Sequence, residues 1–538
     1  MHVYKLLSRP FSEHLLFMLF LFVFATSPYF LYYVNSNHYY YAVIIANHGF
    51  VLSYIVTLLI SFINYRVVRK FVEAALVFFF TAFFCLNFYS LYKLGGLIDV
   101  DYLMLIVNTN PNEAREFVAS MLPGWVVSAV AGIVGAFVAL WWWSRHHNLN
   151  LGRKGSRVAT FLCLLCMVQF VNSWGVWVDG PIKHIADLAT VTKDYEMPEN
   201  LEDYQAKPEI VFADGVKNVP TNVVLIIGES FARYHSSLYG YDKETNPCLS
   251  ALKSKSMLYT MDSVDAPAPT TSLSLKYMLS ECYKEDKSEK KWYEYATIIQ
   301  MMHGCGYDCL WLSNQARAGK FNYIARFFAE SCDRYWFLQN EGTMGKNTEM
   351  DSVLVDSTAL FINDISDNQH HFIVYHMMGS HFEHSLRYPE RFARFTANDY
   401  MNRPEHQREV LATYDNSILY NDYIVAKIME FYENTESLVI YVPDHGQDMF
   451  CSAPDYHEHG KMGNPVSYAY GVKIPFMIYA SQKFQKKHPE TIKRIKQRQE
   501  NPMSWNGDDL PYLIMDLIGV KTVNGKEVAL KSILPPER

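Results

Sequence analysis

The chain has 538 residues, which is too many for one ordinary hydrophobic core, so its length predicts at least two domains. The formal net charge of −7 is modest, and the chain contains no basic run of the kind that binds nucleic acid, so we expect no nucleic-acid partner. Half of the residues are hydrophobic, and the long apolar stretches lie before residue 178, whereas charged residues concentrate after Lys183.

Five of these apolar stretches are each long enough to cross a bilayer, which takes about 20 residues of α-helix. The first is too long, and lacks a small-residue cleavage site, to be a removable signal peptide. A buried helical core in a soluble protein is excluded because the stretches have too few polar faces. We therefore predict a five-helix transmembrane domain at residues 1–178, with spans at Glu13–Val34, Tyr41–Ile63, Val72–Tyr92, Leu122–Trp143 and Val158–Trp177.

Lysine and arginine residues indicate how this domain is oriented. They concentrate in the N-terminal tail and in the loops after the second and fourth stretches, whereas the opposite loops carry only Lys93 and Arg115. Positive loops stay on the cytoplasmic side, so five spans place everything after Trp177 outside the cytoplasm. The positive residues of the inner side are Lys5, Arg9, Arg66, Arg69, Lys70, Arg145, Arg153, Lys154 and Arg157.

Residues 179–221 form a polar, proline-containing connector. Its first part, Pro181–Val191, has an amphipathic pattern that would let it lie along the membrane surface. An ordinary solvated linker explains this composition equally well. After the linker, residues 222–538 alternate strand-like runs with helical patterns, which predicts an α/β domain.

One buried strand of this domain is predicted to end at an acidic residue. The run Val223–Ile227 is apolar and rich in β-branched residues, which suits a strand covered on both faces, and Gly228 lets the chain turn after it. Glu229 follows at the end of the strand, where ligands collect in open α/β sheets. Taken alone, a glutamate that only stabilises a helix N-terminus is an equal alternative.

Two further runs end in the same way. The apolar run in Ser437–Gln447 ends at Asp444 and His445, and the run Phe372–His381 ends at a histidine. Parallel strands would bring these groups to one edge of the sheet, and glutamate, aspartate and histidine together suit a zinc-type ion. Because three strand ends share the pattern, surface acids and ordinary buried histidines are the weaker interpretation.

Two threonines mark the expected start of a helix in Asp265–Ser280. The prolines before them keep the chain extended, and Thr270 and Thr271 then lie at the helix N-terminus. A threonine at this place is usually a helix cap. Its hydroxyl could also face an anion held by the helix N-terminus, where a nucleophile for phosphoryl transfer would be useful.

Six of the nine cysteines lie in the predicted outer domain, where an oxidising compartment would let them form disulfides. A metal cluster of cysteines is the weaker interpretation, because the chain has no repeated CxxC spacing. The six are Cys248, Cys282, Cys305, Cys309, Cys332 and Cys451.

Six motifs follow one another in this region. They are GES at 228–230, LYGYDKETNP at 238–247, TTSLSLKYMLS at 270–280, HMMGSH at 376–381, YDNSILYND at 414–422 and PDHGQ at 443–447. Together they resemble the membrane-anchored phosphoethanolamine transferases, including the lipid A phosphoethanolamine transferases, of the alkaline phosphatase and sulfatase superfamily. The resemblance covers the five-span anchor and nearly all of the outer domain.

The resemblance implies a multi-pass anchor in the inner membrane, a sulfatase-like α/β domain in the periplasm, and a zinc cofactor. Glu229, Thr271, Asp444 and His445 match the zinc ligands of the family. Thr271 also matches the nucleophile, with Thr270 as the alternative. One zinc ion is implied, and a second is left open.

Histidines that hold the transferred phosphate or a second zinc in relatives match His381 and His459, with His457 and His384 as nearby competitors. The implied reaction carries phosphoethanolamine from phosphatidylethanolamine, through a phosphothreonine, to a cell-envelope acceptor such as lipid A or another lipopolysaccharide component. Two alternatives stay open: a phosphoglycerol transferase of the lipoteichoic acid synthase type, and a membrane sensor that has lost turnover.

The chain also departs from the family. Pro267 and Tyr277 stand where a cysteine pair brackets the nucleophile in the lipid A enzymes, so that disulfide cannot form. Gln447 stands where an acid is common beside the metal. These departures affect the prediction of the acceptor molecule more than the prediction of the transfer reaction.

Overall fold

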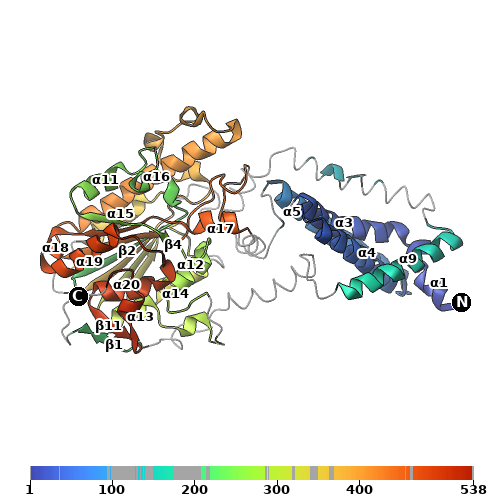
Figure 1. The fold of residues 1–538 in the computed structure, drawn as a ribbon, viewed down its shortest axis with the longest axis horizontal. Helices are drawn as coiled ribbons and strands as arrows, with labels where there is room; N and C mark the ends of the chain where they lie inside the picture. The colour runs from blue at the N-terminus through green and yellow to red at the C-terminus, as the bar shows by residue number, and fades with distance from the viewer. Residues whose placement is uncertain are drawn as a thin grey trace. The chain divides into compact units, whose positions relative to one another are not determined.

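The computed structural model describes two compact units, Met1–Val107 with Val118–Tyr195, and Asn108–Phe117 with Glu196–Arg538 (Figure 1). The structure describes residues 2–35, 37–93, 150–173, 207–213 and 219–535, together with scattered residues between 97 and 139. Within 219–535 there are gaps at 285–287, 289, 318–321, 340–348, 363–368, 455 and 461–463. Most of the predicted linker at residues 179–221, including Pro181–Val191, lies outside the described residues. The boundaries at 178 and 221 therefore stay predictions.

Long apolar helices make up the described part of the first unit. Four of them are long and apolar enough to cross a membrane, over Leu15–Asn35, Tyr39–Ser61, Arg66–Leu91 and Arg153–Asn172. They match four of the five expected spans, so the prediction of a helical membrane domain is confirmed. Most of the fifth, Leu122–Trp143, lies outside the described residues. The helices are α1 His2–Leu7, α2 Arg9–Glu13, α3 Leu15–Asn35, α4 Tyr39–Ser61, α5 Arg66–Lys93 and α9 Arg153–Asn172.

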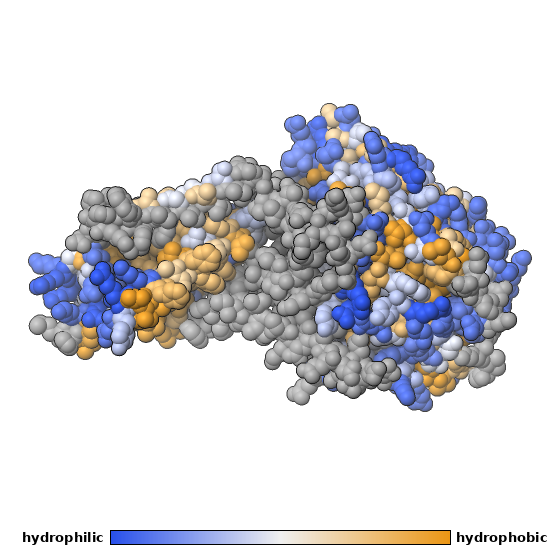
Figure 2. Space-filling view, turned by 180° about the vertical axis from the view of Figure 1, so that it is seen from behind, coloured by the Kyte–Doolittle hydropathy of each residue, from blue (hydrophilic) through white to orange (hydrophobic). Residues whose placement is uncertain are grey.

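Large apolar side chains are exposed on the surface of these helices, as expected for contact with lipid. Only 6% of the apolar window of α5 is buried, and its Phe71 and Phe78 are exposed by 74% and 77%. Figure 2 shows hydrophobic residues gathered on the described helices of this unit. Large exposed apolar areas are rare on soluble proteins, whereas a bilayer covers them.

A seven-stranded sheet forms the centre of the second unit. Its order is β3-β9-β8-β2-β7-β5-β6, in which β8, β2, β7, β5 and β6 are parallel, whereas β9 runs antiparallel to both β8 and β3. The strands are β2 Asn222–Gly228, β3 Leu258–Met261, β5 Asp308–Ser313, β6 Arg334–Phe337, β7 His371–His376, β8 Ser437–Pro443 and β9 Phe476–Ala480. The prediction of an α/β domain is confirmed.

Helices cover both faces of this sheet. Successive side chains of a strand point to opposite faces, and because both sets are apolar, both faces must be buried. In β2, Val223, Leu225 and Ile227 join one core, whereas Val224 and Ile226 join the other. The first core includes residues of α12 Thr271–Met278, α13 Ile298–Gly304, α14 Asn322–Glu330, α17 Pro465–Val472, α18 Gln482–Lys487, α19 Pro489–Glu500 and α20 Leu510–Leu517. The second includes residues of α11 Pro247–Ser254, α15 Ser352–Phe361 and α16 Glu405–Phe431.

Two small sheets complete the unit. One has the order β1-β11-β12, with β1 at Ile210–Phe212, β11 at Val520–Val523 and β12 at Lys526–Glu527. The other pairs β4 at Val264–Asp265 with β10 at Trp505–Asn506, in the segment that leads into α12.

The expectation of disulfides in the outer domain is wrong. All nine cysteines are among the described residues, and all nine are free. Four of the six outer cysteines are buried one by one in the core, where they act as small apolar side chains. The thiols of Cys309 and Cys332 donate to the backbone carbonyls of Ile299 and Phe328, respectively.

Candidate metal centre

Three neighbouring parallel strands end at one edge of the sheet and carry the acidic and histidine residues that the sequence singled out. In the β2–β8 pair Gly228 lies opposite Pro443, so Glu229 and Asp444 leave the sheet side by side. On the other side of β2, β7 ends at His376, and His381 follows five residues later in the loop. The strand order therefore brings together segments more than two hundred residues apart.

Thr271 is the first residue of α12, and its hydroxyl lies at this edge. Its Oγ1 is 3.1 Å from Oε2 of Glu229, to which it donates, and 3.4 Å from Nε2 of His445. Thr270 occupies the N-cap position with extended backbone angles and makes no side-chain cap hydrogen bond. Of the two threonines, the structure places Thr271 against the acidic group.

Glu229 is buried and surrounded by hydrogen-bond donors. Its Oε1 accepts from the hydroxyl of Ser230 at 2.7 Å and lies 3.0 Å from Nε2 of His445. Its Oε2 accepts from Nε2 of Gln315 at 3.2 Å. Ser230 stands in the GES motif, but sequence reasoning assigned it no role of its own. Gln315 was missed, although it carries the same signal as a polar residue that follows the apolar strand β5.

Asp444 is the least satisfied group of the site. Its Oδ1 accepts from the backbone N–H of His445 at 2.7 Å and of Ser230 at 3.4 Å. Its Oδ2 is buried and has no hydrogen-bond partner, and it lies 3.7 Å from Nε2 of His445. A buried carboxylate oxygen without a partner is costly, and a bound cation would supply the missing interaction.

His445 presents its second nitrogen to both carboxylates. Its Nδ1 lies 2.6 Å from the carbonyl oxygen of Gly446, to which a protonated Nδ1 donates, so Nε2 is the atom that faces Glu229 and Asp444. This is the arrangement in which a backbone carbonyl orients a metal-binding imidazole.

The residues present fit a zinc ion. Glu229, His445 and His459 each offer a ligand atom, and these atoms lie within 4.8 Å of one another. With Asp444 they form the oxygen and nitrogen donor set that zinc uses in catalytic sites.

The electrostatics lead to the same conclusion. Burial and then the nearby Glu229 carboxylate raise the pKa of Asp444 well above its usual range. Burial opposes ionisation of Glu229 too, but His445 outweighs it and lowers the pKa of Glu229 well below normal. Burial lowers the pKa of His445, whereas Asp444 and Glu229 together raise it to about 9. Two buried carboxylates therefore compete for one positive charge, and a divalent cation would satisfy both.

The other histidines occupy different places around this group. The ring of His459 lies 4.6 Å from that of His445, and burial, followed by His445, lowers its pKa to about 3. Nδ1 of His381 lies 2.7 Å from the carbonyl oxygen of Phe382. His457 packs against Phe450, with ring centres 5.0 Å apart.

His384 is fully buried, and its Nδ1 lies 2.9 Å from the carbonyl oxygen of Ser380. Its ring packs on Tyr414 at 4.9 Å, and its Nε2 has no partner. Because these contacts lead to Ser380 and Tyr414 and not to the candidate ligands, His384 is the more distant competitor.

The loops that carry these residues are fixed by a second set of contacts. Gly379, with φ of +51°, passes so close to the backbone of Glu229 that an added Cβ would lie 2.8 Å from it. The Asp351 carboxylate accepts from the N–H of Met378 and of Gly379 and holds this loop.

The loop after β2 is held in a similar way, and its Ser230 also has a positive φ, at 56°. The hydroxyl of Tyr414 donates to the Ser230 carbonyl at 2.7 Å and accepts from the N–H of Ala232 at 2.9 Å.

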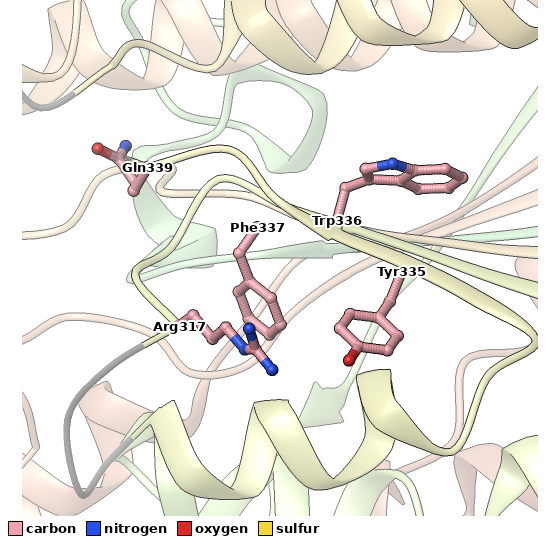
Figure 3. Close-up of a pocket in the computed structure, with 5 residues that line it drawn as sticks. All are labelled: Arg317, Tyr335, Trp336, Phe337 and Gln339. Atoms are coloured by element: carbon pink, nitrogen blue, oxygen red, sulfur yellow. The ribbon is translucent and has the colours of Figure 1, made fainter. Parts of the chain in front are cut away.

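A pocket of about 280 Å³ lies at the edge strand β6. Figure 3 shows the guanidinium of Arg317 beside the rings of Phe337 and Tyr335, with Trp336 on the other side of the strand. Arg317 follows two residues after Gln315, and Phe337 pairs with the last residue of β5. The pocket therefore lies beside the outermost strand of the sheet, and none of its lining residues is a candidate metal ligand. Gln339 also lines it.

Known proteins resemble this chain over most of its length. A family model described as Sulfatase matches residues 221–520. The phosphoethanolamine transferase EptC of Escherichia coli K12 is 26% identical over 430 residues, which cover 75% of this chain and 73% of that protein. The lipooligosaccharide phosphoethanolamine transferase A (EptA) of Neisseria meningitidis, an integral membrane protein, superimposes with a TM-score of 0.71 at 19% identity, covering 98% of this chain and 99% of that one. The periplasmic domain of E. coli EptC, solved as a complex with Zn, superimposes with a TM-score of 0.54 at 26% identity, covering 62% of this chain and 91% of that one.

Proposed function

Since the chain belongs to the sulfatase family, we propose that it is a membrane-anchored, zinc-dependent phosphoethanolamine transferase. One observation carries the proposal: the hydroxyl of Thr271 lies 3.1 Å from Glu229 and 3.4 Å from His445 in a group of buried ligands. The similarity to phosphoethanolamine transferases, one of them solved with zinc, supports the same reaction for this chain.

In this proposal Glu229, Asp444 and His445 hold the zinc ion, and Thr271 lies beside them as the nucleophile. When bound, zinc lowers the pKa of a hydroxyl beside it and offsets the charge that develops on phosphoryl oxygens. The chain contributes a Thr271 hydroxyl already oriented by Glu229, and His445 fixed by Gly446, so little reorganisation precedes the reaction.

The proposed reaction has two steps. Oγ of Thr271 forms a bond to phosphorus of phosphatidylethanolamine, the bond from phosphorus to the glycerol oxygen breaks, and that oxygen leaves as diacylglycerol after accepting a proton. The product is a phosphothreonine that carries ethanolamine. The acceptor then attacks this phosphorus and releases Thr271, while His381 or His459 moves the protons and holds the phosphate. His381, His459 and His457 are the candidates to hold the phosphate or a second zinc ion.

The membrane unit gives the reaction its location. Both the donor lipid and a lipid-anchored acceptor stay in the bilayer, so an anchored enzyme meets both at one surface. We place the helices in the inner membrane and the catalytic domain in the periplasm, on the basis of the positive inner loops. The acceptor that we propose is lipid A or another lipopolysaccharide component, because the sequence motifs resemble those of the lipid A phosphoethanolamine transferases.

Intact-mass measurement of the full-length protein tests this proposal. The protein in detergent is incubated with phosphatidylethanolamine, and wild type is compared with Thr271→Ala and, as the matched control, Thr270→Ala. We expect a phosphoethanolamine adduct on wild type and on Thr270→Ala, and none on Thr271→Ala.

Other outcomes would contradict the proposal. An adduct that disappears in Thr270→Ala instead would move the nucleophile by one residue. A phosphoglycerol adduct formed from phosphatidylglycerol would favour a phosphoglycerol transferase. If zinc-loaded protein forms no adduct from either lipid, the catalytic proposal fails and the sensor hypothesis stands.

A further inference from the structure

A second group of metal-ligating side chains lies at the opposite end of the same sheet. His303, Cys309 and Asp333 each offer a ligand atom, and the three atoms lie within 4.8 Å of one another. His303 belongs to the last turn of α13, Cys309 is the second residue of β5, and Asp333 directly precedes β6. These are the amino ends of the strands, whereas the candidate catalytic centre lies at the carboxyl ends.

Strand register explains why these residues meet. Leu310 pairs with Arg334 in the parallel β5–β6 ladder, so the preceding residues, Cys309 and Asp333, are also neighbours. The N–H of Cys309 donates to Oδ2 of Asp333 at 2.8 Å, and Nε2 of His303 lies 2.8 Å from the same oxygen.

The thiol of Cys309 faces the helix that carries His303. Its Sγ contacts the carbonyl oxygen of Ile299, which precedes His303 by four residues on the same face of α13. The imidazole, the thiol and the carboxylate thus converge from three elements that are separate in the sequence.

The chemistry of the group is that of a zinc ligand set. A thiolate, an imidazole and a carboxylate together carry a charge of −2 when the histidine is neutral, which a divalent ion would balance. The nearest arginine in the ladder, Arg334, is engaged at 2.6 Å by Asp308. His303 and Asp333 have side-chain exposures of 36% and 48%, which provides an entry path and room for small adjustments, whereas Cys309 is fully buried.

We propose that His303, Cys309 and Asp333 bind one divalent ion of the zinc class, with water at the remaining position. The ion would fasten α13 and the start of β5 to the edge strand β6. It would also keep Cys309 from oxidation in an oxidising compartment, because a metal-bound thiolate is shielded. This site has no part in the transfer reaction and does not depend on it.

Cobalt substitution provides a direct test, because a thiolate bound to Co²⁺ gives a charge-transfer absorption that carboxylate and imidazole ligands do not. The full-length protein in detergent is stripped with a chelator under reducing conditions and titrated with Co²⁺ alone. We expect a thiolate band that saturates when both metal centres are filled and is absent in Cys309→Ser. In His303→Ala, whose side chain is partly exposed and whose loss should not prevent folding, cobalt affinity should fall at least about tenfold.

Two controls separate this site from the candidate catalytic centre. Cys248→Ser, a cysteine on α11, should leave the band unchanged, and Asp444→Asn should also leave it unchanged, because none of the catalytic ligands is a cysteine. The proposal is overturned if wild type gives no thiolate band, or if His303→Ala binds cobalt as tightly as wild type. Isolation of the protein with a disulfide between Cys309 and Cys332 would also overturn it.

Discussion

The two ends of the central sheet hold charged groups in opposite environments. At the carboxyl ends, the side chains of Glu229, Asp444 and His445 are completely buried, and one carboxylate oxygen has no hydrogen-bond partner. At the amino ends, His303 and Asp333 are partly exposed and already bonded to each other. Of the two clusters, the one at the carboxyl ends therefore carries the larger cost of removing charged groups from water. In return, its buried charges act strongly on a reacting ligand. The amino-end cluster can exist with or without an ion.

The most severe test of this contrast is Thr271→Ala. Removing the nucleophile should lower phosphoethanolamine transfer at least about 10³-fold, because the remaining groups only bind and polarise the substrate. Release of diacylglycerol from labelled phosphatidylethanolamine measures the rate. Thr270→Ala should retain most of the activity, and comparable losses in both variants would show that the helix start, rather than one hydroxyl, is what matters.

Asp444→Asn should separate metal binding from folding. We expect zinc affinity at the carboxyl-end site to fall at least about 100-fold, since a charged ligand is lost. Without metal, the melting temperature should rise or stay the same, because the substitution removes a like charge buried beside Glu229. Melting with zinc and with chelator measures both effects. A large destabilisation in chelator would show that Asp444 is needed for folding even without an ion.

Tyr414→Phe tests the support of the carboxyl-end loops. The lost hydroxyl bonds both Ser230 and Ala232, so the free energy of unfolding should fall by about 1–3 kcal/mol. Transfer should slow by about tenfold, as for other residues that orient metal ligands. Tyr423→Phe, on the same helix, is the matched control, because the Tyr423 hydroxyl makes no hydrogen bond to any residue that the structure describes. Equal effects of the two variants would rule out a positioning role for Tyr414.

The last prediction concerns Asp422, which lies in neither cluster and acts through the pH dependence of stability. Its carboxylate accepts from the N–H groups of Cys248 and Leu249 at the start of α11, and burial raises its pKa from 3.8 to about 7. The native state therefore binds a proton between about pH 4 and pH 7 that the unfolded state has released, so the contribution of Asp422 to stability is lost as pH rises through this window. The change is at most about 4 kcal/mol.

Asp422→Asn should flatten this pH dependence, because the amide stays neutral at every pH. Urea unfolding followed by tryptophan fluorescence at pH 5, 6 and 7 measures it, with the exposed Glu433→Gln as control. If wild type and Asp422→Asn show the same slope, the carboxyl group of Asp422 has an ordinary pKa in the folded protein.

The comparison of the clusters also shows where sequence reasoning reaches its limit. The strand ends at Glu229 and at Asp444 were predictable, because a buried strand is a continuous apolar run and the polar residue that ends it is visible locally. The cluster of His303, Cys309 and Asp333 has no such pattern, because its ligands do not repeat a CxxC spacing. It follows only from the β5–β6 register. For the same reason Gln315 was missed, and the six outer cysteines were wrongly expected to pair.

The sequence by itself determined the apolar helices, the α/β domain and the acidic strand ends, because periodicity and continuous hydrophobic runs depend on neighbouring residues. Tertiary structure decided which of these ends meet. The order β8-β2-β7 brings Asp444 beside Glu229, and the approach of α12 places Thr271, rather than Thr270, against them. Distances between segments far apart in the chain depend on strand order and register, and no local pattern encodes these.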